Sequence, residues 1–307
     1  HRGIREPTFD VSEGSAPPGF AGRRVPAWVR AIAPRRAAAP PVDDGALAHA
    51  LARRGSTIVA VGSRKGGVGK TSHAAGLAVA GGEALDLIGH RAAIVDANVA
   101  NPDAWGQLNL ARESATVRQV ISAIVNGSEI PQPVYASTPA LACYPESRES
   151  PEYSRLEIAR LADYLRSRFT LVVIDMSNRL PDPTAGPEAA VAAYWLQEAD
   201  VLVLPTGNAK QDFNGVLDYL ELPALPPTVV AQLRARSRRN REHPLARQYM
   251  DAISRKAARV VEIPDEAECV RYAVLEGVPV KDVSGGLRNA YRQLAHAVVD
   301  VVLQPAS

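Results

Sequence analysis

The chain has 307 residues and a formal net charge of +2, and 46% of its residues are hydrophobic but only 5% are aromatic. Its two cysteines exclude a disulfide framework, and no apolar run is long enough to span a membrane. No signal-peptide pattern opens the sequence, so we expect a cytoplasmic protein with a core of Val, Ile, Leu and Ala. We interpret Cys143 and Cys269 as buried small hydrophobic residues.

Residues 1–55 are rich in proline, arginine and alanine and mostly lack helical or strand periodicity. Such a composition buries too little surface to offset the entropy of ordering, so we predict a flexible arm with one short helix over residues 44–53. Apolar residues are interleaved with arginines between Phe20 and Ile32. We interpret this stretch as a solvated linker, because Pro26 breaks the helical pattern, with a partner-binding or membrane-surface peptide as the alternative.

Residues 56–307 alternate between short apolar runs and helix-length segments, which predicts one α/β domain. The runs expected to form buried parallel strands are residues 57–61, 92–95, 171–174, 201–204, 228–231 and 260–263. The expected helices are residues 68–80, 117–125, 151–168, 187–197, 213–220, 245–256 and 284–302. Right-handed crossovers then give a doubly wound, mostly parallel sheet with helices on both faces, and ligands bind beyond the carboxyl ends of its strands.

The first predicted strand leads into a glycine-rich loop that a helix follows. Its glycines let the backbone curl and point N–H groups at phosphate oxygens, and the positive end of the helix attracts the same anion. The second lysine of the loop is expected to reach the β- and γ-phosphates, and the next residue to supply a hydroxyl group to Mg²⁺. A glycine-rich turn with surface lysines is the alternative. The predicted ATP/ADP-binding residues are Lys65, Gly66, Gly67, Val68, Gly69, Lys70, Thr71 and Ser72.

This loop departs from the ordinary phosphate loop, which begins with glycine where this chain has Arg64 and has no lysine at position 65. The pattern Lys-Gly-Gly-x-Gly-Lys-Thr is the deviant Walker A motif, so the chain resembles the ParA/MinD family of partitioning and positioning ATPases. The resemblance implies a P-loop NTPase fold and a homodimer that ATP closes around two nucleotides. It also implies that Lys65 reaches across the dimer interface and neutralises charge on the partner's transferring phosphoryl group.

Later segments resemble the same family in the same order, and together they extend the resemblance over roughly residues 56–303. They correspond to the second strand with the first switch, the Walker B strand, the strand after it, and the closing segment beside the adenine. These segments are residues 93–98, 171–175, 200–206, and 263–266 followed by 276–280.

Two aspartates end predicted strands at the edge where the ligand is expected, Asp96 and Asp175. Magnesium prefers oxygen ligands and keeps several of its waters. We therefore predict that Thr71 binds Mg²⁺ directly and that both aspartates hold it through water. A turn or helix-cap role for each aspartate is the alternative.

Asn98 stands where the family usually has a second acid, which helps to orient the attacking water. An amide can hold a water molecule but cannot take its proton. We therefore expect slow hydrolysis, or switching mainly by nucleotide binding and release, and we expect Asn98→Asp to raise the ATPase rate. The residues assigned to catalysis by the resemblance are Lys65, Lys70, Asp96, Asn98 and Asp175.

Three assignments near the nucleotide rest on the resemblance alone. Residues 176–183 form the second switch, which senses the γ-phosphate, and Arg179 is there either a charge partner or a surface arginine. Gln232 hydrogen-bonds the edge of the base just past its strand, and Pro264 packs on the ring after the last strand.

A basic stripe lies between residues 231 and 259, with eight arginines and one lysine against two acids. DNA phosphates attract such a surface without sequence readout, and ParA-like dimers bind non-specific DNA through a basic C-terminal patch. We expect such binding here, with a solvated loop whose arginines pair with acids as the alternative. The tentative DNA-binding residues are Arg234, Arg236, Arg238, Arg239, Arg241, Arg255 and Lys256.

The last predicted helix, residues 284–302, has the spacing of ordinary core packing, and only residues 303–307 follow it. We therefore expect no C-terminal membrane anchor of the MinD kind.

The leading interpretation is an ATP-dependent dimerising ATPase of the ParA/MinD type that acts in DNA partitioning or intracellular positioning. It would associate with the nucleoid or a membrane and with an unidentified activating or cargo protein. The alternative is a weakly or non-hydrolysing nucleotide-switched module in a secretion, conjugation or polar-localisation system, which Asn98 and the long arm favour. A bacterial tyrosine kinase is a third interpretation, based on residues 96–102; the intact deviant loop and the lack of a C-terminal tyrosine cluster oppose it.

Overall fold

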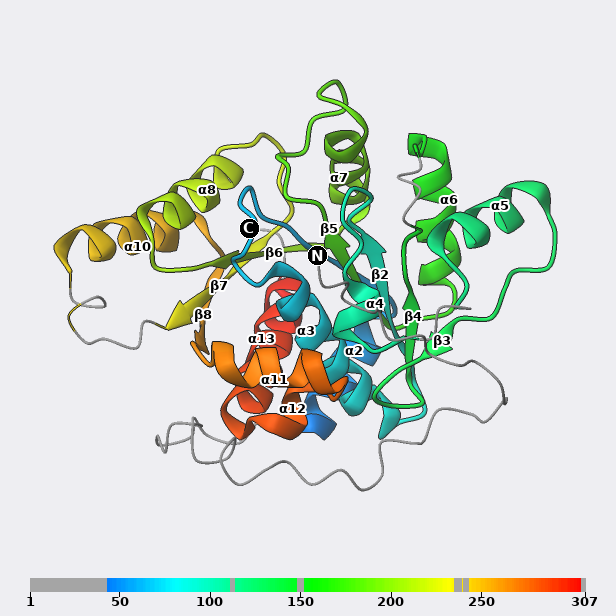
Figure 1. Ribbon diagram of the computed structural model, residues 1–307, viewed down its shortest axis with the longest axis horizontal. Coiled ribbons are helices and arrows are strands. Elements are labelled where there is room, and N and C mark those ends of the chain that lie inside the picture. Colours follow the sequence, from blue (N-terminus) through cyan, green and yellow to red (C-terminus); the bar gives the residue numbers. More distant parts are fainter. Residues whose placement is uncertain (1–42, 111–113, 148–151, 235–238, 240–242, 305–307) are drawn as a thin grey trace, which may run out of the picture.

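The computed structural model describes residues 43–110, 114–147, 152–234, 239 and 243–304 (Figure 1). The part of the predicted arm before residue 43 lies outside these residues. Eight strands in the described chain form one sheet in the order β3-β4-β2-β5-β1-β6-β7-β8. All neighbours are parallel except β3 and β4. The strands are β1 Thr57–Val61, β2 Ala92–Ala97, β3 Val134–Tyr135, β4 Leu141–Tyr144, β5 Leu171–Met176, β6 Val201–Thr206, β7 Thr228–Arg234 and β8 Arg259–Pro264.

Helices cover both faces of this sheet, as the alternating sequence pattern predicts (Figure 1). Those on one face are α2 Asp44–Arg54, α3 Lys70–Asp86, α11 Ala267–Glu276, α12 Val280–Val283 and α13 Gly285–Leu303, with the short α4 Ala104–Gln107 beside them. Those on the other face are α5 Val117–Asn126, α6 Arg155–Arg166, α7 Pro187–Glu198, α8 Lys210–Leu220 and α10 Pro244–Lys256.

The side chains of the central strand β1 pack alternately against the two helix layers. Val59 and Val61 pack in the layer of α3 and α13, whereas Ile58 and Ala60 pack in the opposite layer. Alternate side chains of a strand point to opposite faces, so a strand buried on both faces must be apolar throughout. The same requirement explains the continuous apolar runs from which the other parallel strands were predicted.

Helix α2 joins the folded body, although the sequence analysis placed it in the arm. Leu47 and Leu51 are buried, and the helix packs against α3 and α13. Asp44 also forms a 2.5 Å ion pair with Arg292 of α13. The folded body therefore begins ahead of residue 56.

The cysteines and the helices bear on two expectations drawn from the composition. Cys143 and Cys269 are both buried, as predicted, and neither forms a disulfide within the described residues. Within the described ranges, no helix has the length and apolar character needed to span a membrane.

Candidate functional site

The loop between β1 and α3 has the backbone conformation that anion binding requires. Gly67 and Gly69 both have a φ of 81°, in the left-handed region that glycine adopts at little cost. Gly69 is the N-cap residue of the 17-residue helix α3 and has no side chain to occupy the N–H groups of the first turn. Val68 is buried and anchors the loop, while Gly66 and Gly67 are exposed. The loop therefore presents backbone donors and a positive helix end to solvent.

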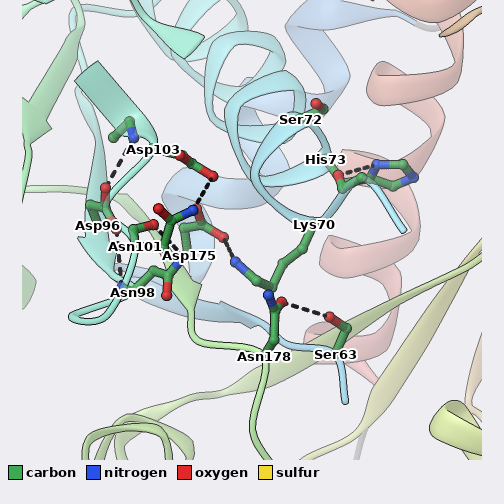
Figure 2. Close-up of polar contacts among 12 residues, drawn as sticks. Ser63, Lys70, Ser72, His73, Asp96, Asn98, Asn101, Asp103, Asp175 and Asn178 are labelled. Atoms are coloured by element: carbon green, nitrogen blue, oxygen red, sulfur yellow. Dashed lines mark hydrogen bonds and ion pairs between the residues drawn. The ribbon is translucent and has the colours of Figure 1, made fainter. Parts of the chain in front are cut away.

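Beneath the loop, the Nζ atom of Lys70 lies 2.6 Å from Oδ1 of Asp175 (Figure 2). Strands β1 and β5 are neighbours, and their register places Val61 opposite Asp175. Lys70 is 5% exposed and Asp175 is fully buried, yet Oδ2 of Asp175 has no hydrogen-bond partner in the described chain. Since buried carboxylate oxygens are normally satisfied, this orphaned acceptor marks a place for a bound water or ligand donor.

Asp96 lies directly opposite Asp175 in the register of β2 and β5. Its Oδ1 accepts the N–H of Asn98 and its Oδ2 accepts the N–H of Ala104, each at 3.0 Å. Burial, and then the nearby charge of Asp175, raise the pKa of Asp96 to about 8. Asp96 thus fixes the loop between β2 and α4, and its water-mediated contact with magnesium stays a prediction.

The loop after Asp96 contains a hydrogen-bonded chain of polar side chains (Figure 2). Asn98 is 4% exposed, and its Nδ2 donates to the carbonyl oxygen of Asn101 at 2.6 Å. The Nδ2 of Asn101 in turn donates to Oδ2 of Asp103 at 3.2 Å. Partial burial and the charge of Asp175 raise the pKa of Asp103, while Lys70 opposes this shift. Asp103 was not among the site residues predicted from the sequence, although an acid seven residues after Asp96 was a visible signal.

Lys65 is held within its own chain in this structure. Its Nζ lies 2.7 Å from Oδ1 of Asp212, whose Oδ2 accepts the N–H of Ala209 at the start of α8. The Lys65 side chain is 45% exposed and Asp212 only 9% exposed. The neighbouring Arg64 pairs with Asp218, also on α8. Both side chains at the start of the loop therefore bind α8, which was not predicted from the sequence.

The first turn of α3 contains a residue that the sequence analysis did not single out, His73. Thr71 and Ser72 are half-buried, and Ser72 Oγ donates to Gln107 of α4 at 3.4 Å. His73 is buried, and its Nδ1 lies 2.8 Å from the carbonyl oxygen of Gly69, so this nitrogen carries the proton. Burial lowers the pKa of His73 to about 4 and keeps the ring neutral. His73 therefore fixes the last glycine of the loop.

The segment after β5, predicted to be the second switch, lies beside the loop. Ser63 Oγ lies 3.4 Å from Oδ1 of Asn178, which belongs to this segment (Figure 2). Arg179 pairs with Glu188 of α7 at 3.1 Å and is 64% exposed. This pairing is the arrangement expected for a surface arginine.

Gln232 and Pro264 do not lie beyond their strands, as the sequence analysis expected. β7 extends to Arg234 and β8 includes Pro264, so both residues are inside paired strands. Gln232 is opposite Glu262, and Pro264 is opposite Arg234. Their contacts with a base stay predictions.

The basic stripe is only partly described: Arg236, Arg238 and Arg241 lie outside the described residues. Arg234 pairs with Glu262 at 3.3 Å, and Lys256 pairs with Glu221 at 3.2 Å. Arg239 and Arg255 are exposed. Two of the described side chains therefore pair with acids, as the solvated-surface alternative expects, and all four remain at the surface.

The donor atoms at the site suit a hydrated magnesium ion. In the described ranges no group of three or more His, Cys, Asp or Glu side chains is arranged to hold a metal. Magnesium in nucleotide sites needs no such group, because phosphate oxygens and waters complete its coordination. The Thr71 hydroxyl and the orphaned oxygen of Asp175 are hard oxygen donors of the required kind.

No protein-family profile matches the sequence, and no curated protein does. Solved structures do match. The structure is similar to MinD of Pyrococcus furiosus, a cell division ATPase, with a TM-score of 0.61 and 20% identity over 79% of this chain and 98% of that chain. It is similar to a ParA family ATPase of Chlorobium tepidum, with a TM-score of 0.59 and 17% identity over 81% of this chain and 98% of that chain. It is also similar to MinD of Pyrococcus horikoshii complexed with Mg-ADP, with a TM-score of 0.58 and 18% identity over 81% of this chain and 96% of that chain. The chain therefore has the ParA/MinD-type P-loop NTPase fold, as the sequence motifs predicted.

Proposed function

We propose that this chain is an ATP-dependent dimerising ATPase of the ParA/MinD type that acts in partitioning or positioning. One observation carries the proposal: the Lys70–Asp175 pair, with its orphaned carboxylate oxygen, lies beneath a loop whose two left-handed glycines open onto the N-terminus of α3. A lysine, a free acceptor and a row of backbone donors are the parts that a magnesium–triphosphate needs. The Mg-ADP bound by the similar P. horikoshii MinD supports this choice of ligand.

In this proposal the loop from Lys65 to Ser72 holds the phosphates, and Gln232 and Pro264 contact the base. Lys70 leaves Asp175 for the β- and γ-phosphates, since a phosphate group offers more acceptor oxygens than one carboxylate. Thr71 would hold Mg²⁺ directly and Asp96 and Asp175 would hold it through water, where the ion neutralises phosphate charge.

Lys65 acts in the second subunit once two chains close around two nucleotides. Its contact with Asp212 is a pair that closure must break. The nucleotide state then controls the dimer, because the γ-phosphate supplies a new partner for the lysine ammonium group.

A solution measurement of molecular mass tests this function. We expect the full chain to be monomeric with ADP and dimeric with ATP and Mg²⁺, and we expect Lys65→Ala to stay monomeric with both nucleotides. Arg160→Ala, an exposed change on α6, is the control and should behave as the wild type. An unchanged mass of the wild type across the nucleotide states would contradict the proposal.

The proposed dimer is expected to bind DNA or a partner protein. The exposed side chains of Arg234, Arg239, Arg255 and Lys256 attract DNA phosphates without base readout. An activating or cargo protein is the other expected partner.

The second candidate is a regulatory module that switches by nucleotide binding with little hydrolysis. The buried, hydrogen-bonded amide of Asn98 favours it, since this side chain offers no carboxylate to an attacking water. A turnover rate that DNA does not change would favour this candidate over a DNA-stimulated ATPase.

A further inference from the structure

Asn98 stands where the family resemblance expects a water-orienting acid, and its main-chain and side-chain N–H groups both form hydrogen bonds within residues 96–101. Asn98 is buried, its main-chain N–H is bound by Asp96, and its amide nitrogen donates to the carbonyl oxygen of Asn101. An aspartate at this position would lose that donor and place a carboxylate against a carbonyl oxygen. Asn98 therefore shapes the loop after β2.

The loop shaped in this way places Asp103 at the open side of the site. Its carboxylate is exposed to solvent and interacts electrostatically with both Asp175 and Lys70. Figure 2 shows one oxygen of this carboxyl group joined to the Asn101 side chain, which lies beside the Lys70–Asp175 pair in this view. Asn101 binds Oδ2 of Asp103, and among the described side chains Oδ1 of Asp103 remains as an acceptor for water.

The Asp103 side chain does not cap the helix that follows it. Asp103 is the N-cap residue of α4, yet it makes no capping hydrogen bond within the described residues. Aspartate is favoured at N-caps because its oxygen accepts a main-chain N–H of the first turn. Instead, the main-chain carbonyl oxygen of Asp103 accepts the N–H groups of Gly106 and Gln107, and Asp96 accepts the N–H of Ala104. The Asp103 carboxylate therefore takes no part in the start of α4.

A second, independent observation shows that this place is built to receive a donor. Oδ2 of Asp175 is fully buried and has no partner among the described side chains. A water or ligand hydrogen that satisfied it would lie at the Lys70–Asp175 pair, with whose charges Asp103 interacts.

We propose that Asp103 supplies the carboxylate that orients the attacking water in this chain, in place of the acid that is missing at position 98. The proposal rests on the ATPase function proposed above. The water oxygen forms a bond to the γ-phosphorus, and the bond from that phosphorus to the β–γ bridging oxygen breaks. ADP leaves with the bonding electron pair, and Asp103 takes the proton of the water and returns it to solvent.

Steady-state ATP hydrolysis and equilibrium MgATP binding by the full chain test this role together. We expect Asp103→Asn to lower turnover by about 100-fold, the effect typical of losing a positioned acid–base group, while MgATP affinity changes by less than about threefold. Contrary to the expectation drawn from the sequence alone, Asn98→Asp should not raise the rate, because it removes the donor to the carbonyl oxygen of Asn101. Asp163→Asn makes the same chemical change on an exposed residue of α6 and should leave both quantities unchanged.

Chemical rescue separates this role from a merely structural one. Formate added to Asp103→Ala should restore part of the lost turnover, because a small carboxylate can enter an open site but cannot repair a fold. Unchanged turnover in Asp103→Asn, a parallel loss of MgATP affinity, or no rescue by formate would each overturn the role of Asp103. A wild type that binds MgATP without turnover would also overturn it, whereas a wild type that does not bind MgATP would refute the proposed function itself.

Discussion

The ion pair between Lys65 and Asp212 gives the most quantitative prediction about dimerisation. The Nζ–Oδ1 distance is 2.7 Å, but Lys65 is 45% exposed, so solvent screens the pair strongly. A charge-assisted but half-exposed hydrogen bond of this kind contributes about 1 kcal/mol. A dimer in which both lysines cross the interface must break two such pairs, at a cost of about 2 kcal/mol, or about 30-fold in the dimerisation constant.

Asp212→Asn removes the charge and keeps an oxygen that can accept the N–H of Ala209 at the start of α8. We expect this variant to strengthen ATP-dependent dimerisation about 30-fold, as measured by sedimentation equilibrium with MgATP. Glu221→Gln is the matched control, because it releases the exposed Lys256 near the end of the same helix. Dimerisation by Asp212→Asn that equals or falls below that of the wild type would refute the view that this pair restrains Lys65.

Three further predictions concern stability and DNA. Gly76→Ala should destabilise the chain by about 1–3 kcal/mol in chemical denaturation, because the added Cβ would lie 2.5 Å from the ring of Tyr291. Gly285→Ala is the control, because a Cβ there meets nothing within 4 Å. Equal denaturation midpoints of the two variants would contradict this packing. Burial raises the pKa of Glu146 from 4.5 to about 7, so the folded chain keeps a proton that the unfolded chain releases. The stability from this group is complete below pH 4.5 and is lost as the pH rises through about 7. Compared with the wild type, Glu146→Gln should flatten that pH dependence by about 3 kcal/mol, and parallel curves would contradict it. The double change Arg255→Ala and Lys256→Ala should weaken DNA retention and lower the slope of its salt dependence by about 2, and an unchanged slope would exclude these two side chains from a DNA contact.

The sequence predicted the parallel strands because each is a continuous apolar run buried on both faces. β1 was predicted with its observed bounds, and the other five predicted strands extend one to three residues further. β3 and β4 were missed: one has two residues, and Leu-Ala-Cys-Tyr of the other contains no β-branched residue. The four-residue helices α4 and α12 are too short to show a helical period, and α11 was also missed.

The candidate site was predictable where its residues follow strands and not where they depend on loops. Lys70, Asp96 and Asp175 meet because parallel strands end at one edge of the sheet. The partner of Lys65 is 147 residues away, and no local pattern indicates such a contact. The direction of Asp103 follows from hydrogen bonds within its loop, which spacing alone does not reveal.

The central claim is that the loop ahead of α3 binds a magnesium-bound triphosphate, and calorimetric titration of the full chain with ATP tests it most directly. We expect saturable one-to-one binding that requires Mg²⁺ and that Lys70→Ala abolishes, while the exposed change Arg160→Ala leaves it intact. Absence of ATP binding by the wild type, or binding by Lys70→Ala as tight as that of the wild type, would contradict the assignment of this site.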